Sequence, residues 1–464
     1  MIDDLVHPTA WLTAGGDDRL ALDPVTGLNR YGRGPLPVPG LLAFGSATAS
    51  TISSGAFEAA NALRNELQLA SQRLEAKALY TLCETTLAGS LRDSLGLPDV
   101  SIHFCPSGTD IHSDVQKALV GKSPASLLTL VTPSNETGSG IRSALDSPLV
   151  TSVDAFRALE GGNATYEFHL RERHGGIRAD SAIEAELSAL LDAAHDKAWA
   201  CLLVVTDVSK TGLIGPCLAT VMNLKARWPR LTILIDACQW RLSAEAICAY
   251  IAHGFMVAIT GSKFMAGPSF SGALIVPPHL SRLSFSPTLS SQCNWGLLLR
   301  WAAALHELSR FQNLLTREVS EVCRKFAKTI NARLARDSNF MPMEVAPLNR
   351  QALFGSLQAE PEYQTIFPFW LTPDRVPLDR ADVHVAYDRL CRPRLGQAVH
   401  LGQAVCLDGG PPVLRLCLSA PLIVEACQSE TGLRTLIDDA LHTLDLTSLA
   451  AMEVSVKKPR RRVS

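Results

Sequence analysis

Three short runs of apolar residues stand close together in the middle of the chain, at 231–235, 255–259 and 272–276. Each run is too short for a typical helix, and its composition is that of a buried strand. Asp236 directly follows the first run, and Lys263 comes shortly after the second. Because open α/β sheets bind ligands beyond the ends of their strands, this pattern places a carboxylate and an amine at a candidate site.

Four further strand-like runs precede this region, at 102–105, 126–132, 166–170 and 198–205. Helical patterns separate them; residues 181–197, for example, carry acids in the early turns and a stripe of leucines at helical spacing. Seven strands that alternate with helices predict an α/β fold. We expect a mainly parallel, doubly wound, seven-stranded sheet with helices on both faces.

The same patterns predict how the chain is divided. The expected parts are an N-terminal arm (1–55), a large domain (56–305), a smaller α+β C-terminal domain (306–450) and a basic, disordered tail (451–464). Long helical patterns cover residues 56–96 and the stretch that starts at Trp295, and the second of these is expected to bridge the two domains.

Composition excludes several classes of protein. The chain has 464 residues, of which 47% are hydrophobic, so it can form a large packed core. Its 43 basic and 45 acidic residues nearly cancel, which gives no electrostatic case for nucleic-acid binding. No apolar run is long enough to span a bilayer, and the N-terminus lacks the pattern of a signal peptide, so we expect a cytoplasmic protein. The 12 cysteines form no metal-binding motif, and no metal is expected.

An acid and a lysine at neighbouring strand ends suit pyridoxal phosphate (PLP) chemistry. The lysine amine forms a Schiff base with the cofactor, and the acid keeps the pyridine nitrogen protonated. Each residue alone has a plainer interpretation, because an Asp at a strand end is often a helix cap and a Lys is often a solvated loop residue.

The wider motif resembles the fold-type I PLP-dependent enzymes, and most of all their branch of class V aminotransferases and cysteine desulfurases. The residues that carry the resemblance are Asp-x-x-Gln, then Lys, then Gly-Pro and a strand that begins Gly-Ala-Leu. The resemblance implies that Lys263 forms the Schiff base, that Asp236 contacts the pyridine nitrogen and that Gln239 lies near the ring hydroxyl. It also implies the fold of the PLP-dependent transferases.

A strand–turn–helix pattern at 102–116 contains Ser107, Gly108 and Thr109 in its turn. A helix N-terminus with such a turn can bind an anion, although the same residues are also an ordinary helix cap. The resemblance implies that this turn holds the cofactor phosphate, together with Thr260 and Ser262 beside the lysine.

The loop that should face the cofactor ring departs from the family pattern. After the strand at 126–132 the chain has neither the histidine of the desulfurases nor the aromatic residue of many aminotransferases, and Asn135 and Glu136 stand there instead. His112 could substitute, or it could be a solvated helix residue. Where the family has an amide that reaches the ring hydroxyl, Ser209 or Asp207 could take that role or could stabilise the turn.

Arg415 lies in the strand-like run VLRLCLSAP on its buried side. A buried arginine needs an anion. The resemblance implies that Arg415 binds the α-carboxylate of an amino-acid substrate, and an internal ion pair is the alternative.

These residues predict a PLP-dependent enzyme that acts on an amino acid through a lysine Schiff base and a carbanion at Cα, as an aminotransferase does. The alternatives are a PLP-dependent lyase, with β-elimination or C–S or C–C cleavage, and a catalytically idle binding protein of the same fold. A persulfide-forming desulfurase is disfavoured because the loop at 336–366 contains no cysteine. The resemblance also implies a homodimer, in which the loop at 284–291 reaches the partner's active site.

Overall fold

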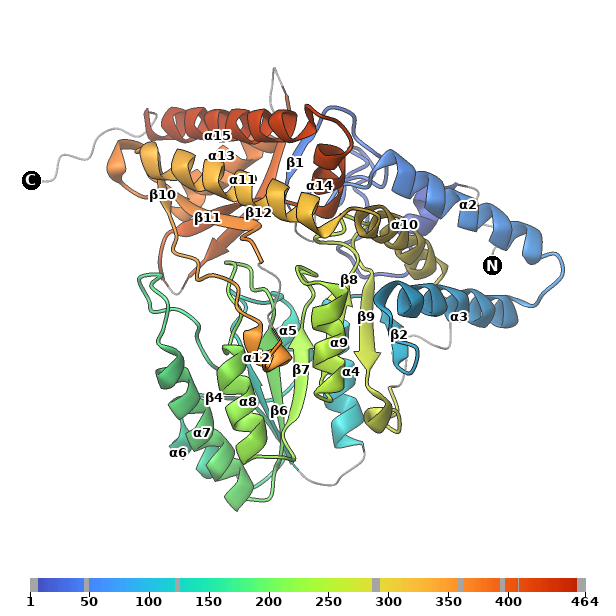
Figure 1. The fold of residues 1–464 in the computed structure, drawn as a ribbon, viewed down its shortest axis with the longest axis vertical. Helices are drawn as coiled ribbons and strands as arrows, with labels where there is room; N and C mark the ends of the chain where they lie inside the picture. The colour runs from blue at the N-terminus through green and yellow to red at the C-terminus, as the bar shows by residue number, and fades with distance from the viewer. Residues whose placement is uncertain are drawn as a thin grey trace, which may run out of the picture.

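The computed structural model describes residues 7–45, 50–121, 126–285, 293–357, 362–392, 397–407 and 409–456. These residues form an eight-stranded sheet and a five-stranded sheet, one above the other in Figure 1. No helix in the described ranges is both long and apolar enough to cross a membrane.

The large sheet has the strand order β2-β9-β8-β7-β6-β3-β5-β4. The strands are β2 (Ser101–Cys105), β3 (Leu127–Val131), β4 (Leu149–Val150), β5 (Asn163–Glu167), β6 (Ala200–Thr206), β7 (Thr232–Asp236), β8 (Met256–Thr260) and β9 (Gly272–Val276). Neighbouring strands from β8 to β4 are parallel, whereas β9 is antiparallel to both β8 and β2. The predicted mainly parallel α/β sheet is confirmed. The eighth strand, β4, was not predicted, because a strand of two residues leaves no readable pattern.

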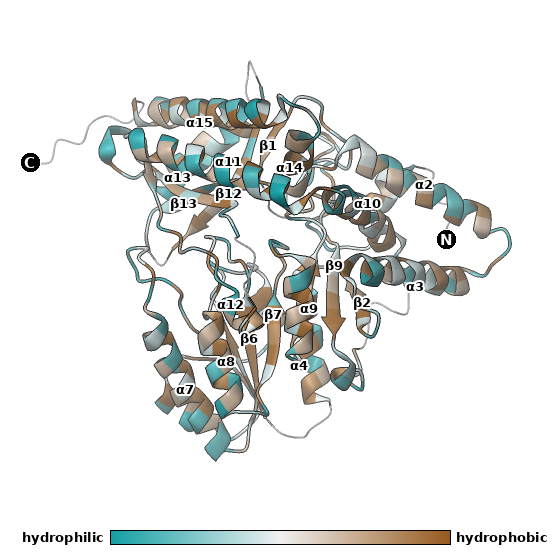
Figure 2. Ribbon diagram, in the orientation of Figure 1, coloured by the Kyte–Doolittle hydropathy of each residue, from teal (hydrophilic) through white to brown (hydrophobic). Residues whose placement is uncertain are grey.

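Helices cover both faces of the large sheet (Figure 1). They are α4 (Gly108–Val120), α5 (Ile141–Ala144), α6 (Val153–Arg157), α7 (Asp180–Asp196), α8 (Leu218–Arg227) and α9 (Ala244–Ala252). Alternate residues of one strand therefore enter different cores. Leu203 and Val205 of β6 belong to one apolar cluster, and Leu202 and Val204 belong to another. Figure 2 shows these strands as an apolar layer between helices with polar outer surfaces.

The small sheet has the order β1-β12-β13-β11-β10. Its strands are β1 (Leu42–Phe44), β10 (Phe340–Pro342), β11 (Ile366–Leu371), β12 (Val399–Cys406) and β13 (Pro412–Cys417), and it is accompanied by α11 (Thr316–Arg336), α13 (Arg380–Cys391), α14 (Ala420–Cys427) and α15 (Gly432–Val456). Strand β1 comes from the N-terminal arm and pairs in parallel with β12. Helix α15 includes the first residues of the tail expected from 451, and residues 457–464 lie outside the described part.

Both long helices expected from sequence are broken in two. The first is α2 (Ser54–Ala70) followed by α3 (Ala76–Leu95), and the second is α10 (Trp295–Gln312) followed by α11. Each second helix starts after a residue with extended backbone, Glu75 with ψ 147° and Leu315 with ψ 133°. Helical periodicity continues through such short breaks, which is why the sequence pattern did not reveal them.

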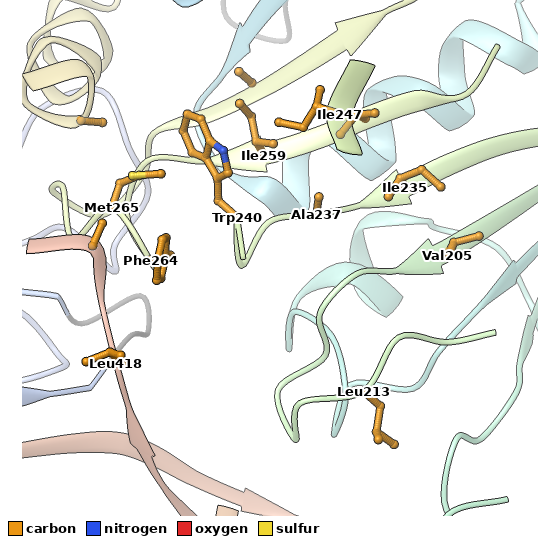
Figure 3. Close-up of a cluster of buried hydrophobic side chains, with 14 of the residues drawn as sticks. Val205, Leu213, Ile235, Ala237, Trp240, Ile247, Ile259, Phe264, Met265 and Leu418 are labelled. Carbon is orange, nitrogen blue, oxygen red and sulfur yellow. The ribbon is translucent and has the colours of Figure 1, made fainter. Parts of the chain in front are cut away.

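The ends of β7 and β8 face the small sheet. The loop after β8 carries Phe264, whose carbonyl accepts a hydrogen bond from the N–H of Ala420 at 2.8 Å. Figure 3 shows Phe264 and Met265 between the large-sheet strands and Leu418, which follows β13. The predicted catalytic residues therefore lie where the two sheets meet.

Candidate functional site

Asp236 ends β7, and its carboxylate is buried. The Thr137 hydroxyl donates to Oδ2 at 2.6 Å, the N–H of Cys238 donates to Oδ1 at 3.2 Å, and Nε2 of His112 lies 3.4 Å from Oδ2. Burial by itself raises the pKa of Asp236, but His112, the charge of Lys263 and the Thr137 hydroxyl together hold the pKa well below its ordinary value. Asp236 is therefore ionised at neutral pH and can pair with a cation.

His112 lies on α4 and is completely buried. The alternative of a solvated helix residue is therefore wrong. Its Nδ1 lies 2.7 Å from the carbonyl oxygen of Gly108. Because a carbonyl only accepts, Nδ1 carries a proton, and Nε2 is the atom that faces Asp236. His112 and Asp236 are 124 positions apart in the sequence, so helical periodicity alone could not reveal the contact between α4 and β7.

Helix α4 starts at Gly108, directly after β2, and its first N–H groups are available to an anion. The Ser107 hydroxyl accepts from the N–H of Asp110 at 3.3 Å and donates to the Asp110 carboxylate at 2.7 Å. Within the described ranges, no backbone carbonyl accepts a hydrogen bond from the N–H groups of Gly108 and Thr109. A Cβ at position 108 would lie 2.7 Å from Sγ of Cys238, so only glycine allows this approach. Gly108 and Thr109 thus stand at an anion-binding helix end, whereas the Ser107 side chain is already engaged.

The turn after β8 brings Lys263 to the same place. The Thr260 hydroxyl donates to the carbonyl of Cys238 at 2.8 Å, so its proton is already used within the protein. Ser262 is buried beside it. Because β7 and β8 are parallel neighbours, Lys263 follows β8 at the same edge of the sheet at which Asp236 ends β7.

Gln239 follows Asp236 by three residues and is buried. Its Oε1 has no hydrogen-bond partner in the part of the chain that the structure describes. A buried amide oxygen without a donor is rare in native proteins. Gln239 is therefore suited to accept a hydrogen bond from a ligand.

Glu136 is tied into a buried cluster. Ser209 donates to its Oε2 at 2.7 Å, the Thr211 hydroxyl lies 2.8 Å from Oε1, and Nε of Arg171 lies 3.3 Å from Oε1. Both Glu136 and Ser209 thus stabilise the turn after β6. Because the Ser209 hydroxyl already donates to Glu136, it is not free to donate a hydrogen bond to the ring hydroxyl of a cofactor.

Asp207 is engaged in the same manner. Its Oδ2 accepts from the Tyr250 hydroxyl at 2.6 Å and from Nε of Arg350 at 2.8 Å, and Nη2 of Arg350 contacts Oδ1. Arg350 in turn contacts Glu362. Asp207 therefore holds Arg350, and through it Glu362, against the large sheet. Sequence reasoning did not find this pair, because Arg350 lies in a segment without a periodic pattern.

Arg415 lies on β13 and is 3% exposed. Its Nη2 donates to the carbonyl of Gln403 at 2.8 Å and its Nη1 to the carbonyl of Lys210 at 3.5 Å, while its Nε has no partner. Among the described residues, no carboxylate forms an ion pair with Arg415, so no internal partner of the kind that the alternative requires is seen there. Burial is the main reason why the pKa of Arg415 is lowered. This guanidinium is suited to bind an anion from outside the chain.

Lys210 is a second lysine near the site that the sequence did not single out. Its Nζ donates to the carbonyl of Ser134 at 2.7 Å. Burial, followed by the positive charges of Arg415 and Lys263, lowers the pKa of Lys210 to about 7. Lys210 is thus a further cation near Arg415 and Lys263, and a lowered lysine pKa of this kind is common at functional sites.

The loop expected to reach a partner's site falls mostly on 286–292, outside the described residues. Asn294, just beyond it, caps α10 and donates to the carbonyl of Gly15 at 2.8 Å. In this chain it thus connects α10 to the N-terminal arm.

Comparison with solved structures finds this fold in PLP-dependent enzymes. A lysine-to-alanine variant of C-DES, with glycine covalently linked to its PLP cofactor, aligns with a TM-score of 0.55 and 15% identity, over 87% of this chain and 96% of that one. A NifS-like protein gives 0.55 and 11%, over 87% and 99%. Oryza sativa TDC with PLP gives 0.55 and 14%, over 92% and 85%.

These similarities confirm the predicted fold. The chain has the architecture of the fold-type I PLP-dependent enzymes, with a large mainly parallel sheet and a smaller mixed sheet. No protein-family model and no curated protein matches the sequence.

Proposed function

We propose that this chain is a PLP-dependent enzyme of the aminotransferase type, which acts at Cα of an amino acid. The observation that carries the proposal is a buried Asp236 carboxylate, held ionised at a strand end beside Lys263, in the fold that binds PLP in the structural neighbours. A buried ionised carboxylate without a charged ligand is costly, and a protonated pyridine nitrogen supplies the matching charge.

The residues of the site fit the cofactor. Gly108 and Thr109 offer backbone N–H groups to the phosphate at the start of α4. Asp236 would pair with the ring nitrogen, and the unpartnered Oε1 of Gln239 suits the ring hydroxyl. Because the Ser107 and Thr260 hydroxyls already donate within the protein, we assign them a lesser part in phosphate binding, and Ser262 remains a proposed contact.

Two side chains would act on the substrate. When bound, PLP supplies an aldehyde that takes up the amino group and a ring that accepts electrons from Cα. Arg415 would bind the α-carboxylate and so fix which bond of Cα is presented. The amine of Lys263 would remove and return the Cα proton as general base and acid.

A PLP-dependent lyase is the second candidate. It is favoured by the similarity to C-DES, a cystine C-S lyase solved in complex with its reaction product cysteine persulfide. Single turnover with an amino acid separates the two reactions. A transaminase leaves the cofactor in its amine form and releases a keto acid, whereas an eliminating lyase releases ammonia and returns the cofactor unchanged.

We propose that the enzyme is a cytoplasmic homodimer with a shared active site, as the resemblance implies. Light scattering of the purified protein measures the oligomeric state directly, and a monomer at micromolar concentration would contradict the dimer.

The test of the proposed function is cofactor binding. The purified protein, titrated with PLP, should gain the visible absorbance of a lysine-bound cofactor, and Lys263→Ala should abolish it. Lys328→Ala, an exposed position on α11, is the matched control and should bind PLP as the wild type does. A wild type that binds no PLP would contradict the proposal and would favour a catalytically idle protein of the same fold.

A further inference from the structure

Arg241 is a buried arginine, and the edge of its guanidinium formed by Nε and Nη2 makes no hydrogen bond within the described ranges. It lies five residues after Asp236 and is 6% exposed. Its Nη1 donates to the Thr365 hydroxyl at 2.7 Å and to the carbonyl of Leu418 at 2.8 Å. Its Nε and Nη2 are buried, and neither has a hydrogen-bond partner within the described ranges. Arg241 therefore holds the two sheets together with one nitrogen and leaves two donors unsatisfied.

Another buried arginine of this protein shows which group the Nε–Nη2 edge can bind. Arg350, also buried, uses the same pair of atoms: its Nε donates to Oδ2 of Asp207 at 2.8 Å and its Nη2 contacts Oδ1. Nε and Nη2 form the fork that matches the two oxygens of a carboxylate. The free edge of Arg241 is thus of the kind that receives a carboxylate at Arg350.

A buried arginine can lack a carboxylate partner for purely structural reasons, as Arg300 shows. This arginine is completely buried, and all three of its guanidinium nitrogens donate to carbonyls, those of Phe270, Leu12, Ala14 and Gly15. Every guanidinium nitrogen of Arg300 thus has a partner within the protein. Arg241 differs, because its Nε and Nη2 have none within the described ranges.

The position of Arg241 connects it to the proposed active site. Its guanidinium lies over the ring of Phe264, 5.1 Å from the centroid, and Phe264 directly follows Lys263. Arg415 is close enough that its charge contributes to lowering the pKa of Arg241 to about 10, after the larger effect of burial. Two buried arginines, one from each side of the junction between the sheets, thus approach the same region without a carboxylate on either.

We propose that Arg241 is a second carboxylate-binding residue of the site, and that the substrate is an amino acid with an acidic side chain. The proposal rests on the proposed function: Arg415 binds the α-carboxylate and Arg241 binds the side-chain carboxylate. Two guanidiniums without anionic partners are matched by a ligand with two carboxylates, whereas a neutral amino acid would leave one of them unpaired.

Equilibrium binding to the PLP-loaded protein tests the proposal. L-Aspartate and L-glutamate are compared with L-asparagine and L-glutamine by calorimetry and by the change in cofactor absorbance. At least one acidic amino acid should bind about tenfold or more tightly than its amide, because the amide leaves a charge unpaired. Arg241→Gln should remove this preference, and Arg241→Lys should retain part of it.

Arg227→Gln is the matched control, because it removes the same charge from an exposed ion pair with Asp192; it should leave the preference unchanged. The wild-type comparison decides the matter even if Arg241→Gln does not fold. A wild type that binds PLP and amino acids but does not distinguish acids from amides overturns this inference alone. A wild type that binds no PLP overturns the proposed function together with it.

Discussion

Nε2 of His112 lies 3.4 Å from Oδ2 of Asp236, and both side chains are buried. The contact joins the helix whose first turn is proposed to hold the cofactor phosphate to the strand whose carboxylate is proposed to hold the ring nitrogen. His112 is a positioning residue in this arrangement, since it would act on the cofactor through Asp236.

Replacing His112 tests this role. His112→Asn should weaken PLP binding by about tenfold, which corresponds to about 1.4 kcal/mol, because the Asp236 carboxylate loses its facing group and its pKa rises. The dissociation constant from fluorescence or absorbance titration measures the effect. His442→Asn, at an exposed position of α15, should have no effect on binding. Equal PLP affinity in His112→Asn and wild type would remove His112 from the site.

Gly108→Ala tests the close approach of α4 to β7. An added Cβ would lie 2.7 Å from Sγ of Cys238, so we expect PLP affinity to fall by about tenfold or more as the helix end moves. The double variant Gly108→Ala, Cys238→Ala should recover much of the loss, because the smaller side chain makes room. Gly89→Ala, in α3, where the added Cβ would come no closer than 4.0 Å to Nη2 of Arg92, should at most stabilise the protein by about 0.5–1 kcal/mol. Failure of the double variant to recover affinity would show that the clash is not the cause.

Glu136 should matter for stability. Glu136→Gln leaves the buried Arg171 without a charged partner and loosens the bonds to Ser209 and Thr211, so we expect the free energy of unfolding to fall by about 3 kcal/mol. Urea unfolding measures the change. Glu321→Gln, which breaks an exposed pair with Lys325, should cost less than about 1 kcal/mol. A similar small effect at Glu136 would contradict its structural role.

Lys210 should make stability depend on pH. Because its pKa is about 7 in the folded protein and about 10.4 in an unfolded chain, the unfolded state binds more protons between these values, and the penalty for burying the charge falls as pH rises through that window. Lys210→Met should therefore stabilise the protein at pH 7, by about 1–2 kcal/mol, and the gain should shrink toward pH 10. Urea unfolding at several pH values checks this. A gain that does not change with pH would indicate a packing effect instead.

The strands, and the placement of Asp236 and Lys263 after two of them, were predictable from sequence because these signals are local. Apolar runs mark β7, β8 and β9, and the polar residues that follow each run fall at the strand ends whatever else the chain does. Arg415 was also predictable, since its alternation within β13 placed it on a buried side.

Long-range contacts were not predictable in this way. His112 reaches Asp236, and Arg350 reaches Asp207, only because distant segments pack together. The breaks after α2 and α10 were missed because the flanking residues keep helical spacing. The free edge of Arg241 has no sequence signal at all, since an arginine after a strand is ordinarily solvated.

We propose that Lys263 is the lysine that binds PLP. Borohydride reduction of the PLP-loaded protein, followed by peptide mass spectrometry, identifies the modified lysine directly. We expect a single phosphopyridoxyl group on the peptide that contains Lys263, and none on Lys210, although the pKa of Lys210 of about 7 makes its amine reactive. Modification of Lys210, or a label spread over exposed lysines, would contradict it.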